Sequence, residues 1–302
     1  MTTKHNPDQN FKSGFIAIAG APNAGKSTLL NRILGEKISI TSKKPQTTRN
    51  RILGVAHRPG AQLIFFDTPG VFHAADEMNL RIVDAALAAV SDADLILIVV
   101  DAARPDQNAE RYLIKRLQDQ NLPAILALNK IDLIEKHHLL PLIEKWQKRH
   151  AFQCVVPISA IDGTQIEELL QAMEEVLPPG PAFYPEDTLT DLSERFIAAE
   201  LIREKVFRFT GEEIPYATAV TIETFKSRDQ ERLVTIEATI HLERQSQKGI
   251  VIGRNGRMLK RIGTEARKAI EALLETRVYL KLFVSVQKNW RKDTRALRRF
   301  GY

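Results

Sequence analysis

The chain has 302 residues, enough for two domains, and its 44% hydrophobic and 26% charged content excludes a largely disordered or fibrous protein. Residues 1–182 hold 20 basic and 20 acidic side chains, whereas residues 244–302 hold 16 and 4. This basic end favours a polyanionic partner, either a nucleic acid or an anionic membrane surface, although a merely solvated basic face is the alternative.

The N-terminal stretch MTTKHNPDQNFKSG has no apolar core after its charges, so we expect no secretory signal. The longest clean apolar run, Leu95–Val100, is far shorter than the roughly 20 residues that span a bilayer. The single cysteine, Cys154, lies in the strand-like run CVVPISA, where apolar filler is favoured over a catalytic thiol. One cysteine also fits a reducing compartment, and we therefore expect a cytoplasmic protein.

Short apolar runs alternate with helix-like stretches through the first half of the chain. The runs are nearly continuous, which is typical of strands buried on both faces, and they are Phe15–Ala19, Leu63–Phe66, Leu95–Val100, Ala124–Leu128 and Val155–Ile158. The helix-like stretches are Ser27–Leu34, Asn79–Val90, Gln107–Gln118 and Gln165–Val176. This alternation predicts an α/β fold with a mostly parallel sheet and helices on both faces. Arg51–Ala56 breaks the alternation and predicts one antiparallel edge strand.

The composition changes near Leu177, where LPPGPAFYPED holds four prolines in eleven residues and indicates a linker. Beyond it, the pattern predicts a smaller α+β domain. Its expected elements are a helix near Leu189–Phe209, strands near Thr218–Phe225 and Leu233–Leu242, helices around a glycine loop, and a last strand near Val278–Val286.

A complete phosphate-binding motif, G-x-x-x-x-G-K-S, occupies residues 20–27 between the first strand and the first helix. The glycines allow backbone N–H groups to surround phosphate oxygens, and the helix adds its positive N-terminal end. Lys26 is expected to reach the β- and γ-phosphates, and the Ser27 hydroxyl to bind Mg²⁺.

Two further segments fit the same phosphate site. Asp67-Thr68-Pro69-Gly70 ends a strand of the same sheet, so the Asp67 carboxylate can reach the Mg²⁺ shell and the Gly70 N–H can sense the γ-phosphate. The loop before it, SITSKKPQTTRNRI, is expected to supply a threonine to Mg²⁺. Thr48 is the candidate, with Thr47 as the alternative.

The segment Asn129-Lys130-Ile131-Asp132 follows another strand and predicts guanine selectivity. The Asp132 carboxylate can accept hydrogen bonds from the ring N–H and the exocyclic amine of guanine, which adenine cannot supply. Lys130 would lie along the base plane. Ser159-Ala160 ends the next strand, where a backbone N–H could meet the guanine oxygen.

The ordered set GAPNAGKS, QTTR, DTPG, NKID and SA resembles the G domain of the Era family of translation-factor-class GTPases. RQSQKGIVIGRNGRMLKRIGTEAR resembles that family's type II KH domain, and KNWRKDTRALRRFGY its C-terminal end. The resemblance covers essentially the whole chain. It divides the chain into a P-loop NTPase G domain at 1–177, a linker at 178–188, and a type II KH domain with a basic extension at 189–302. Ala21 and Ala24 stand where arginine and valine are frequent in relatives, but these positions contribute mainly backbone.

The resemblance implies a Mg²⁺-dependent GTPase that converts GTP to GDP and couples its nucleotide state to the 3′ end of small-subunit (16S) ribosomal RNA. It further implies a role in assembly of the 30S subunit and partial association with the bacterial inner membrane, and we expect a monomer. The residues expected to contact GTP are Gly20, Ala21, Pro22, Asn23, Ala24, Gly25, Lys26, Ser27, Thr28, Asp67, Thr68, Pro69, Gly70, Val71, Asn129, Lys130, Ile131, Asp132, Ser159 and Ala160.

The expected catalytic residues are Lys26, Thr48, Gly70 and Asn23. In Ras-type enzymes a glutamine orients the attacking water, but here Val71 follows Gly70 and supplies no side-chain oxygen. The resemblance suggests that Asn23 helps to hold K⁺ near the phosphates. A role in bending the loop is the alternative for this residue.

Gly253-Arg254-Asn255-Gly256 joins two predicted helices, and such a loop lets a nucleic-acid backbone approach while the adjoining groove holds about four nucleotides. Its glycines could instead serve the turn alone. The basic surroundings favour single-stranded RNA. The expected RNA-binding residues are Gly253, Arg254, Asn255, Gly256, Arg257, Lys260 and Arg261.

Two rival functions remain at this stage. A P-loop kinase or metabolic ATPase is disfavoured by NKID and QTTR. A GTPase whose basic tail binds membrane or protein is disfavoured by the GxxG loop, although the amphipathic stretch NWRKDTRALRRF could bind a membrane. For Trp290 and Phe300 in that stretch, local packing is favoured over anchoring. The histidines have no ligand spacing, and no zinc site is expected.

Overall fold

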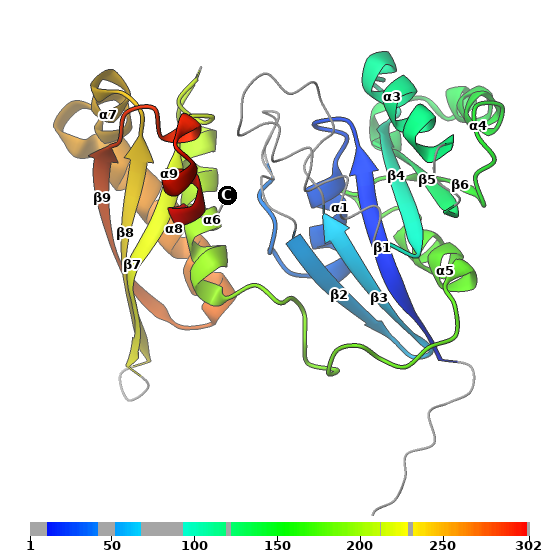
Figure 1. Cartoon of the computed structure of the whole chain (residues 1–302), viewed down its shortest axis with the longest axis horizontal. Coiled ribbons are helices and arrows are strands. Elements are labelled where there is room, and N and C mark those ends of the chain that lie inside the picture. The colour runs from blue at the N-terminus through cyan, green and yellow to red at the C-terminus, as the bar shows by residue number, and fades with distance from the viewer. Residues whose placement is uncertain are drawn as a thin grey trace, which may run out of the picture. The chain divides into compact units, whose positions relative to one another are not determined.

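The computed structural model describes residues 11–41, 52–67, 93–118, 122–211, 213–228 and 232–300. These residues fall into two compact units, each with its own sheet (Figure 1). The first unit contains residues 11–38, 52–67 and the described part of 93–191, and the second contains residues 39–41 and the described part of 192–302.

A six-stranded sheet with the order β2-β3-β1-β4-β5-β6 forms the centre of the first unit. Its strands are β1 (Lys12–Gly20), β2 (Ile52–Arg58), β3 (Ala61–Asp67), β4 (Leu95–Asp101), β5 (Ala124–Asn129) and β6 (Val155–Ile158). Only β2 runs antiparallel to its neighbour. Every residue of β3 and β5 is buried, which explains why their sequences are mostly apolar, with Gln62, Asp67 and Asn129 as the buried polar exceptions. The predicted sheet, including its antiparallel edge strand, is confirmed.

Helices flank this sheet (Figure 1). They are α1 (Lys26–Leu34), α3 (Gln107–Gln118), α4 (Leu139–Gln147) and α5 (Ile166–Val176), with short 3₁₀ helices at Ile131–Leu133 and Lys136–His138. Helices α1, α3 and α5 agree with the predicted stretches, whereas α4 was missed. The helix expected at Asn79–Val90 lies outside the described residues.

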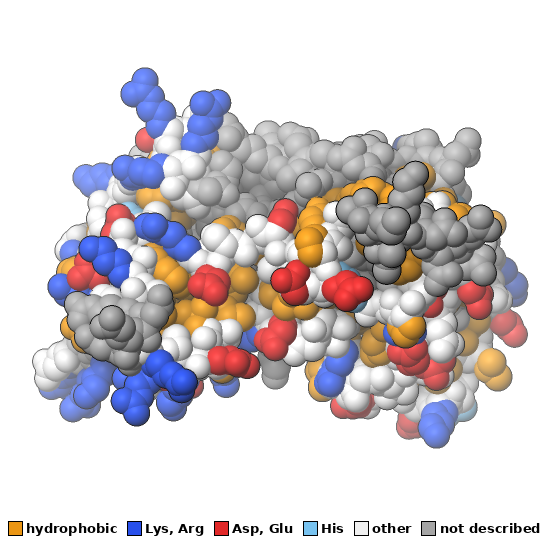
Figure 2. Space-filling view, turned by 90° about the horizontal axis from the view of Figure 1, so that it is seen from below, with side chains coloured by type: hydrophobic (Ala, Val, Ile, Leu, Met, Phe, Trp, Pro, Cys, Tyr) orange, Lys and Arg blue, Asp and Glu red, His pale blue; other side chains and the backbone are white. Residues whose placement is uncertain are grey.

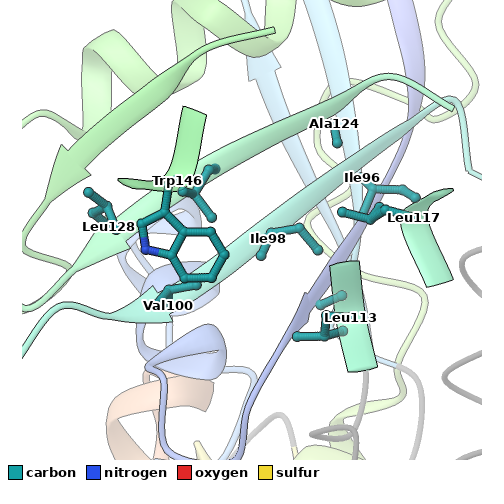
Figure 3. Close-up of a cluster of buried hydrophobic side chains, with 10 residues drawn as sticks. Ile96, Ile98, Val100, Leu113, Leu117, Ala124, Leu128 and Trp146 are labelled. Carbon is teal, nitrogen blue, oxygen red and sulfur yellow. The ribbon is translucent and has the colours of Figure 1, made fainter. Parts of the chain in front are cut away.

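Trp146 of α4 fills an apolar cluster between the helices and strands β4 and β5 (Figure 3). Its side chain is 3% exposed, and it packs in a cluster that includes Ile98, Leu113 and Leu128. The cluster fixes the carboxyl ends of β4 and β5. Those ends carry Asp101 and Asn129, which belong to the candidate site described below.

The proline-rich connecting segment, residues 178–190, is hydrogen-bonded to the first unit along much of its length. The buried side chain of Gln62 on β3 accepts from the Phe183 and Tyr184 N–H groups at 2.7 and 3.0 Å and donates to the Tyr184 carbonyl at 2.7 Å. Further along, the Val55 N–H donates to the Leu189 carbonyl at 2.8 Å. The segment thus follows the sheet down to strand β2.

The first helix of the second unit, α6 (Glu194–Phe209), begins five residues later than its predicted start at Leu189. Ser193 caps it by accepting from the Phe196 N–H at 3.2 Å. Leu189 is instead held by strand β2, as described above, and so cannot join the helix.

A three-stranded sheet with the order β7-β8-β9 completes the second unit with its helices. The elements are β7 (Ala219–Arg228), β8 (Leu233–Leu242), α7 (Gln245–Ile252), α8 (Arg257–Leu274), β9 (Arg277–Val286) and α9 (Thr294–Arg299), with 3₁₀ turns at Arg254–Gly256 and Trp290–Lys292. Strands β7 and β8 are antiparallel, and β8 and β9 are parallel. The predicted α+β domain is confirmed.

Candidate functional site

The loop between β1 and α1 has a backbone that its two glycines make possible. Gly25 has a φ of 103°, and a Cβ placed there would lie 2.1 Å from the amide nitrogen of Asn129. A Cβ at Gly20 would lie 2.3 Å from the Val99 carbonyl oxygen. Asn23, with a φ of 63°, also takes the left-handed conformation, which asparagine tolerates. The loop therefore has a backbone without obstructing side chains at its glycines, so its N–H groups can approach phosphate oxygens closely.

Lys26, the first residue of α1, is almost completely buried in this loop. Its ammonium donates to the Gly20 and Ala21 carbonyls at 3.1 and 3.0 Å. Burial lowers the pKa of Lys26 from 10.5 to about 8, and the Asp67 carboxylate opposes that change. A poorly hydrated ammonium against a glycine loop is well placed to exchange these carbonyls for phosphate oxygens.

Ser27 and Asp67 meet at the carboxyl end of the sheet. The Ser27 hydroxyl donates to Asp67 Oδ2 at 2.7 Å, and Asp67, the last residue of β3, is fully buried. A hydroxyl and a carboxylate are the oxygen ligands that Mg²⁺ prefers, and both lie beside the phosphate loop. The two residues present thus fit a magnesium ion that also binds phosphate.

Asn129 joins the phosphate loop to the loop after β6. Its side-chain amide donates to the Ala24 carbonyl at 2.8 Å, and its Oδ1 accepts from the Ala160 N–H at 3.0 Å. The side chain is 2% exposed. Sequence reasoning placed Asn129 beside the base, whereas the structure shows that it also ties two loops of the site together.

Lys130 is the second link between the two ends of the site. Its ammonium donates to the Asn23 carbonyl at 2.7 Å and to Asp101 Oδ2 at 2.5 Å. Asp101 ends β4, and its Oδ1 accepts from the Ala103 and Arg104 N–H groups at 3.0 and 2.9 Å. Sequence reasoning missed Asp101, although a carboxylate at the end of the apolar run LILIVVD was a usable signal.

Asp132 lies opposite Ser159 at the expected base end of the site. The buried Ser159 hydroxyl donates to Asp132 Oδ1 at 2.7 Å, while Asp132 itself is exposed. The serine fixes one carboxylate oxygen and so orients the group. Arg32 of α1, also missed from the sequence, donates to the Ala160 carbonyl at 3.1 Å and to the Ile161 carbonyl.

The remaining predicted nucleotide residues divide into two groups. Those in described segments beside the site are Pro22, Thr28 and Ile131. Those outside the described residues are Thr47, Thr48, Thr68, Pro69, Gly70 and Val71. Roles proposed for the second group rest on the sequence alone.

The turn between α7 and α8 contains the predicted GxxG loop. Gly253, with a φ of 70°, is packed so closely that a Cβ would lie 2.7 Å from the Met258 Cβ. Asn255 and Gly256 also have positive φ values, 54° and 73°. Arg254 and Asn255 are exposed at the tip of the turn. The turn therefore offers two exposed polar side chains on a backbone that requires glycine.

Three basic side chains follow this turn on α8. Arg257, Lys260 and Arg261 are all exposed. The Arg261 guanidinium also lies over the Phe209 ring of α6, 4.2 Å from its centroid, so this side chain is partly held by packing. Figure 2 shows further Lys and Arg side chains over the second unit, at its left.

The aromatic residues of the C-terminal stretch pack inside the second unit. Trp290 is fully buried, its Nε1 donates to the Ala217 carbonyl at 3.0 Å, and its ring meets Phe300 edge-on with centroids 5.2 Å apart. The preference for local packing over anchoring agrees with this geometry.

Among the helices in the described part of the chain, none combines the length and the hydropathy of a membrane-spanning segment. In the same part of the chain, no three His, Cys, Asp or Glu side chains gather in a way that could hold a metal ion. The Cys154 thiol is half-buried, and burial raises its pKa, with Glu175 adding to the effect.

Comparison with known families matches both units. Residues 15–130 match the family described as 50S ribosome-binding GTPase, and residues 213–291 match the KH domain family. The chain is 50% identical to GTPase Era of Geotalea uraniireducens over 295 residues, which cover 98% of this chain and 99% of that protein. It is 52% identical to GTPase Era of Geobacter metallireducens over the same shares of the two chains.

Two solved structures are also similar over nearly the whole chain. A point variant of Era from Aquifex aeolicus, bound to GDP and AlF4⁻, has a TM-score of 0.93 and 40% identity. Era in complex with MgGDPNP and nucleotides 1506–1542 of 16S ribosomal RNA has a TM-score of 0.93 and 41% identity. In both comparisons the similarity covers 97% of this chain and 99% of the other.

Proposed function

The chain belongs to the Era family of GTPases, and from this premise we propose that it couples the binding and hydrolysis of GTP to the binding of small-subunit ribosomal RNA. It is a GTPase that uses Mg²⁺. The nucleotide assignment rests on the two hydrogen bonds of the Asn129 side chain. They link Ala24 of the phosphate loop to Ala160 of the loop after β6, which lies beside Asp132. Such a link holds the phosphate and base ends of one nucleotide site in register.

We propose the following roles for the site residues. Lys26 binds the β- and γ-phosphates, and Ser27 and Asp67 hold Mg²⁺, which neutralises charge on the phosphate oxygens when it is bound. Asp132 selects guanine, and the Ala160 N–H, which donates to Asn129 Oδ1 in the structure, exchanges that partner for the guanine oxygen. From the sequence, Thr48 would complete the magnesium shell and Gly70 would contact the γ-phosphate.

Hydrolysis is expected to proceed without a side-chain glutamine, because Val71 follows Gly70. We propose that Asn23 helps to hold K⁺ near the phosphates, where the ion would supply the positive charge that an arginine finger supplies in other GTPases. The Lys130 ammonium donates to the Asn23 carbonyl, and this fixed backbone supports a defined position for the Asn23 side chain.

The second unit is proposed to bind single-stranded RNA at its GxxG loop. Support comes from the exposed Arg254 and Asn255, from the KH family match, and from the 16S ribosomal RNA bound to the similar Era structure. We further propose that residues 1–177 form the GTP-binding domain, 178–188 the connection and 189–302 the RNA-binding domain.

We propose that the protein acts as a cytoplasmic monomer in assembly of the 30S subunit. We propose that contact with the inner membrane is peripheral and uses the exposed basic side chains of α9 rather than the buried Trp290.

Crosslinking of the purified protein to cellular RNA, with GTP and GDP compared, tests the coupling. The expected result is enrichment of small-subunit ribosomal RNA that differs between the two nucleotides. Equal recovery with both nucleotides would contradict the coupling. A competition assay with ATP tests the rival kinase or ATPase function, and ATP is expected not to displace bound GTP.

A further inference from the structure

The sheet of the second unit has one face without helix α8. The β8 side chains Val234, Ile236, Ala238, Ile240 and Leu242 are buried on the helix side. On β9, Leu282 belongs to that side, because a Cβ on Gly263 of α8 would lie 3.3 Å from its Cδ1. Side chains alternate along a strand, so the β9 residues Arg277, Tyr279, Lys281 and Phe283 point to the other side, here called the open face.

The open face exposes two aromatic rings. Tyr279 is 57% exposed and Phe283 is 43% exposed, which places both among the large apolar side chains that the described residues leave in solvent. Lys281 lies between them on the strand, and its ammonium is 4.9 Å from the centroid of the Phe283 ring. Four residues of strand separate the rings by roughly 13 Å, so they would stack on bases that are not neighbours.

The open face is polar around these rings and carries side chains of both charges. The strand register places Thr235 beside Tyr279 and Thr239 beside Phe283, and Lys226 of β7 lies next to Thr235. Lys226 and Arg277 are exposed. Two carboxylates lie on the same face: that of Glu237 is 3.5 Å from the Lys281 ammonium, and that of Glu223 accepts from the Thr221 hydroxyl at 2.7 Å. Rings that alternate with cations and hydroxyl groups suit a nucleic acid better than an apolar protein surface.

The C-terminal helix adds basic side chains at one end of this face. Phe300 packs against His241 of β8, with ring centroids 4.4 Å apart, and His241 pairs with Ser285 in the register. Helix α9 thereby borders the end of the face beyond Phe283. Its exposed residues include Arg295 and Arg298.

We propose that this open face is a second RNA-binding surface of the protein, at which Tyr279 and Phe283 stack on unpaired bases and Arg277, Lys281 and the α9 arginines contact the phosphates. Aromatic rings on an open sheet bind single-stranded RNA in this way in other folds. The surface is separate from the GxxG loop, because α8, which starts directly after that loop, covers the opposite side of the sheet. The proposal extends the RNA binding proposed above.

The experiment compares RNA affinities of the full-length protein by fluorescence anisotropy. The long probe is RNA with the sequence of nucleotides 1506–1542 of 16S ribosomal RNA. The short probe is a four-nucleotide fragment, which is long enough to fill only the GxxG groove. The variant Tyr279→Ser with Phe283→Ser is expected to bind the long RNA at least about tenfold more weakly, because each stacked base contributes about 1–3 kcal/mol. Its affinity for the short fragment should equal that of the parent.

Controls separate this proposal from the GxxG assignment. Tyr279→Phe with Phe283→Tyr keeps both rings and should bind the long RNA like the parent. Leu140→Ser removes another exposed apolar side chain and should also bind this RNA like the parent. Arg254→Asp with Asn255→Asp should weaken binding of both RNAs. If that variant binds both RNAs like the parent, the GxxG assignment is wrong, but the open-face proposal is not affected.

The open-face proposal is overturned if the serine variant binds the long RNA like the parent. Ultraviolet crosslinking of the unmodified protein gives a second readout that does not depend on a variant. Crosslinks on peptides that contain Tyr279 or Phe283 would support the proposal, and crosslinks confined to residues near the GxxG loop would overturn it. Loss of binding to 30S subunits with unchanged affinity for RNA would assign the face to a protein and also overturn it.

Discussion

Asp101 and Lys130 form an ion pair in which Asp101 Oδ2 lies 2.5 Å from the Lys130 ammonium. The same ammonium donates to the Asn23 carbonyl of the phosphate loop. The carboxylate is itself fixed by the Ala103 and Arg104 N–H groups. The end of β4 therefore holds the lysine that links the base end of the site to the phosphate loop.

Replacement of Asp101 should weaken the binding of guanine nucleotides without changing the fold. In Asp101→Ala, Lys130 loses a charge-assisted hydrogen bond that contributes roughly 1.5–3 kcal/mol, so GTP and GDP affinity should fall about tenfold. Asp106→Ala is the control, because the Asp106 carboxylate instead accepts from the N–H groups of Asn108 and Ala109 at the start of α3. Fluorescent-nucleotide titration measures both, and equal affinities would refute the positioning role.

Guanine selectivity should change with Asp132. Asp132→Asn replaces an acceptor by a group that can donate, so GTP binding should fall and xanthosine triphosphate should become the preferred ligand. Ser159 can still contact the new amide oxygen, so the loop should keep its position. Competition between the two nucleotides measures the preference, and an unchanged GTP affinity would show that Asp132 does not bind the base.

Nucleotide binding should take up a proton at Lys26 above neutral pH. The folded protein lowers the pKa of Lys26 to about 8, and phosphate oxygens favour the ammonium form. GTP affinity should therefore fall as the pH rises above about 8. Calorimetry at pH near 8.5 in two buffers of different ionisation enthalpy should give different heats for the protein and equal heats for Lys26→Arg, whose guanidinium stays charged.

The same pKa fixes the direction of a stability change. The unfolded chain, in which Lys26 has a pKa near 10.5, binds this proton more tightly than the nucleotide-free folded protein does. The Lys26 contribution should therefore make the free energy of unfolding rise between about pH 8 and pH 10.5. Urea unfolding at several pH values measures the free energy of unfolding of the parent and of Lys26→Arg. The parent value minus the variant value should rise with pH over this range. A difference that stays flat or falls would show that Lys26 is not desolvated.

GTP turnover should be faster in potassium than in sodium buffer, because the proposed ion site at Asn23 would supply positive charge in the transition state. Asn23→Gly keeps a backbone that accepts the φ of 63° but removes the side chain, so the difference between the two buffers should disappear. Phosphate release measured at equal ionic strength tests both. Equal rates for the parent in the two buffers would discard the cation site.

The nucleotide motifs could be predicted because each is contiguous in the sequence, and those at residues 20–27, 67–70, 129–132 and 159–160 also stand at the ends of apolar strands. Asp101 also follows an apolar strand, but its partner Lys130 is distant in the sequence, and Arg32 contacts the distant carbonyls of Ala160 and Ile161 with no local pattern to mark it. Helix α4 was missed because Pro141 interrupts its apolar pattern, although proline is tolerated in the first turn of a helix.

The connecting segment shows another limit of sequence reasoning. Its prolines predict an extended linker, and that composition cannot reveal that the buried Gln62 of β3 binds it with three hydrogen bonds. A polar side chain inside an otherwise apolar strand was the available signal, because a buried amide needs partners. The late start of α6 follows from the same contacts, since Leu189 pairs with Val55.

RNA binding should depend on the GxxG loop and weaken steeply with salt. Arg254→Asp with Asn255→Asp places two carboxylates where the RNA backbone must pass, and the fold should survive because both side chains are exposed and aspartate tolerates the positive φ of Asn255. Each lost phosphate contact should reduce the slope of log affinity against log salt by roughly 0.7. GTP hydrolysis by the isolated G domain, residues 1–177, should be unaffected.

Lys268→Asp is the matched control, because Lys268 is exposed on α8 about three helical turns beyond the loop and pairs with Glu265. Its effect on affinity should be small, and the same salt series measures it. A folded Arg254→Asp, Asn255→Asp protein that binds single-stranded ribosomal RNA like the parent, with the parent's salt slope, would show that the loop serves only the turn. The basic charge of residues 244–302 would then have to act on RNA elsewhere on the second unit, or on a membrane or protein partner.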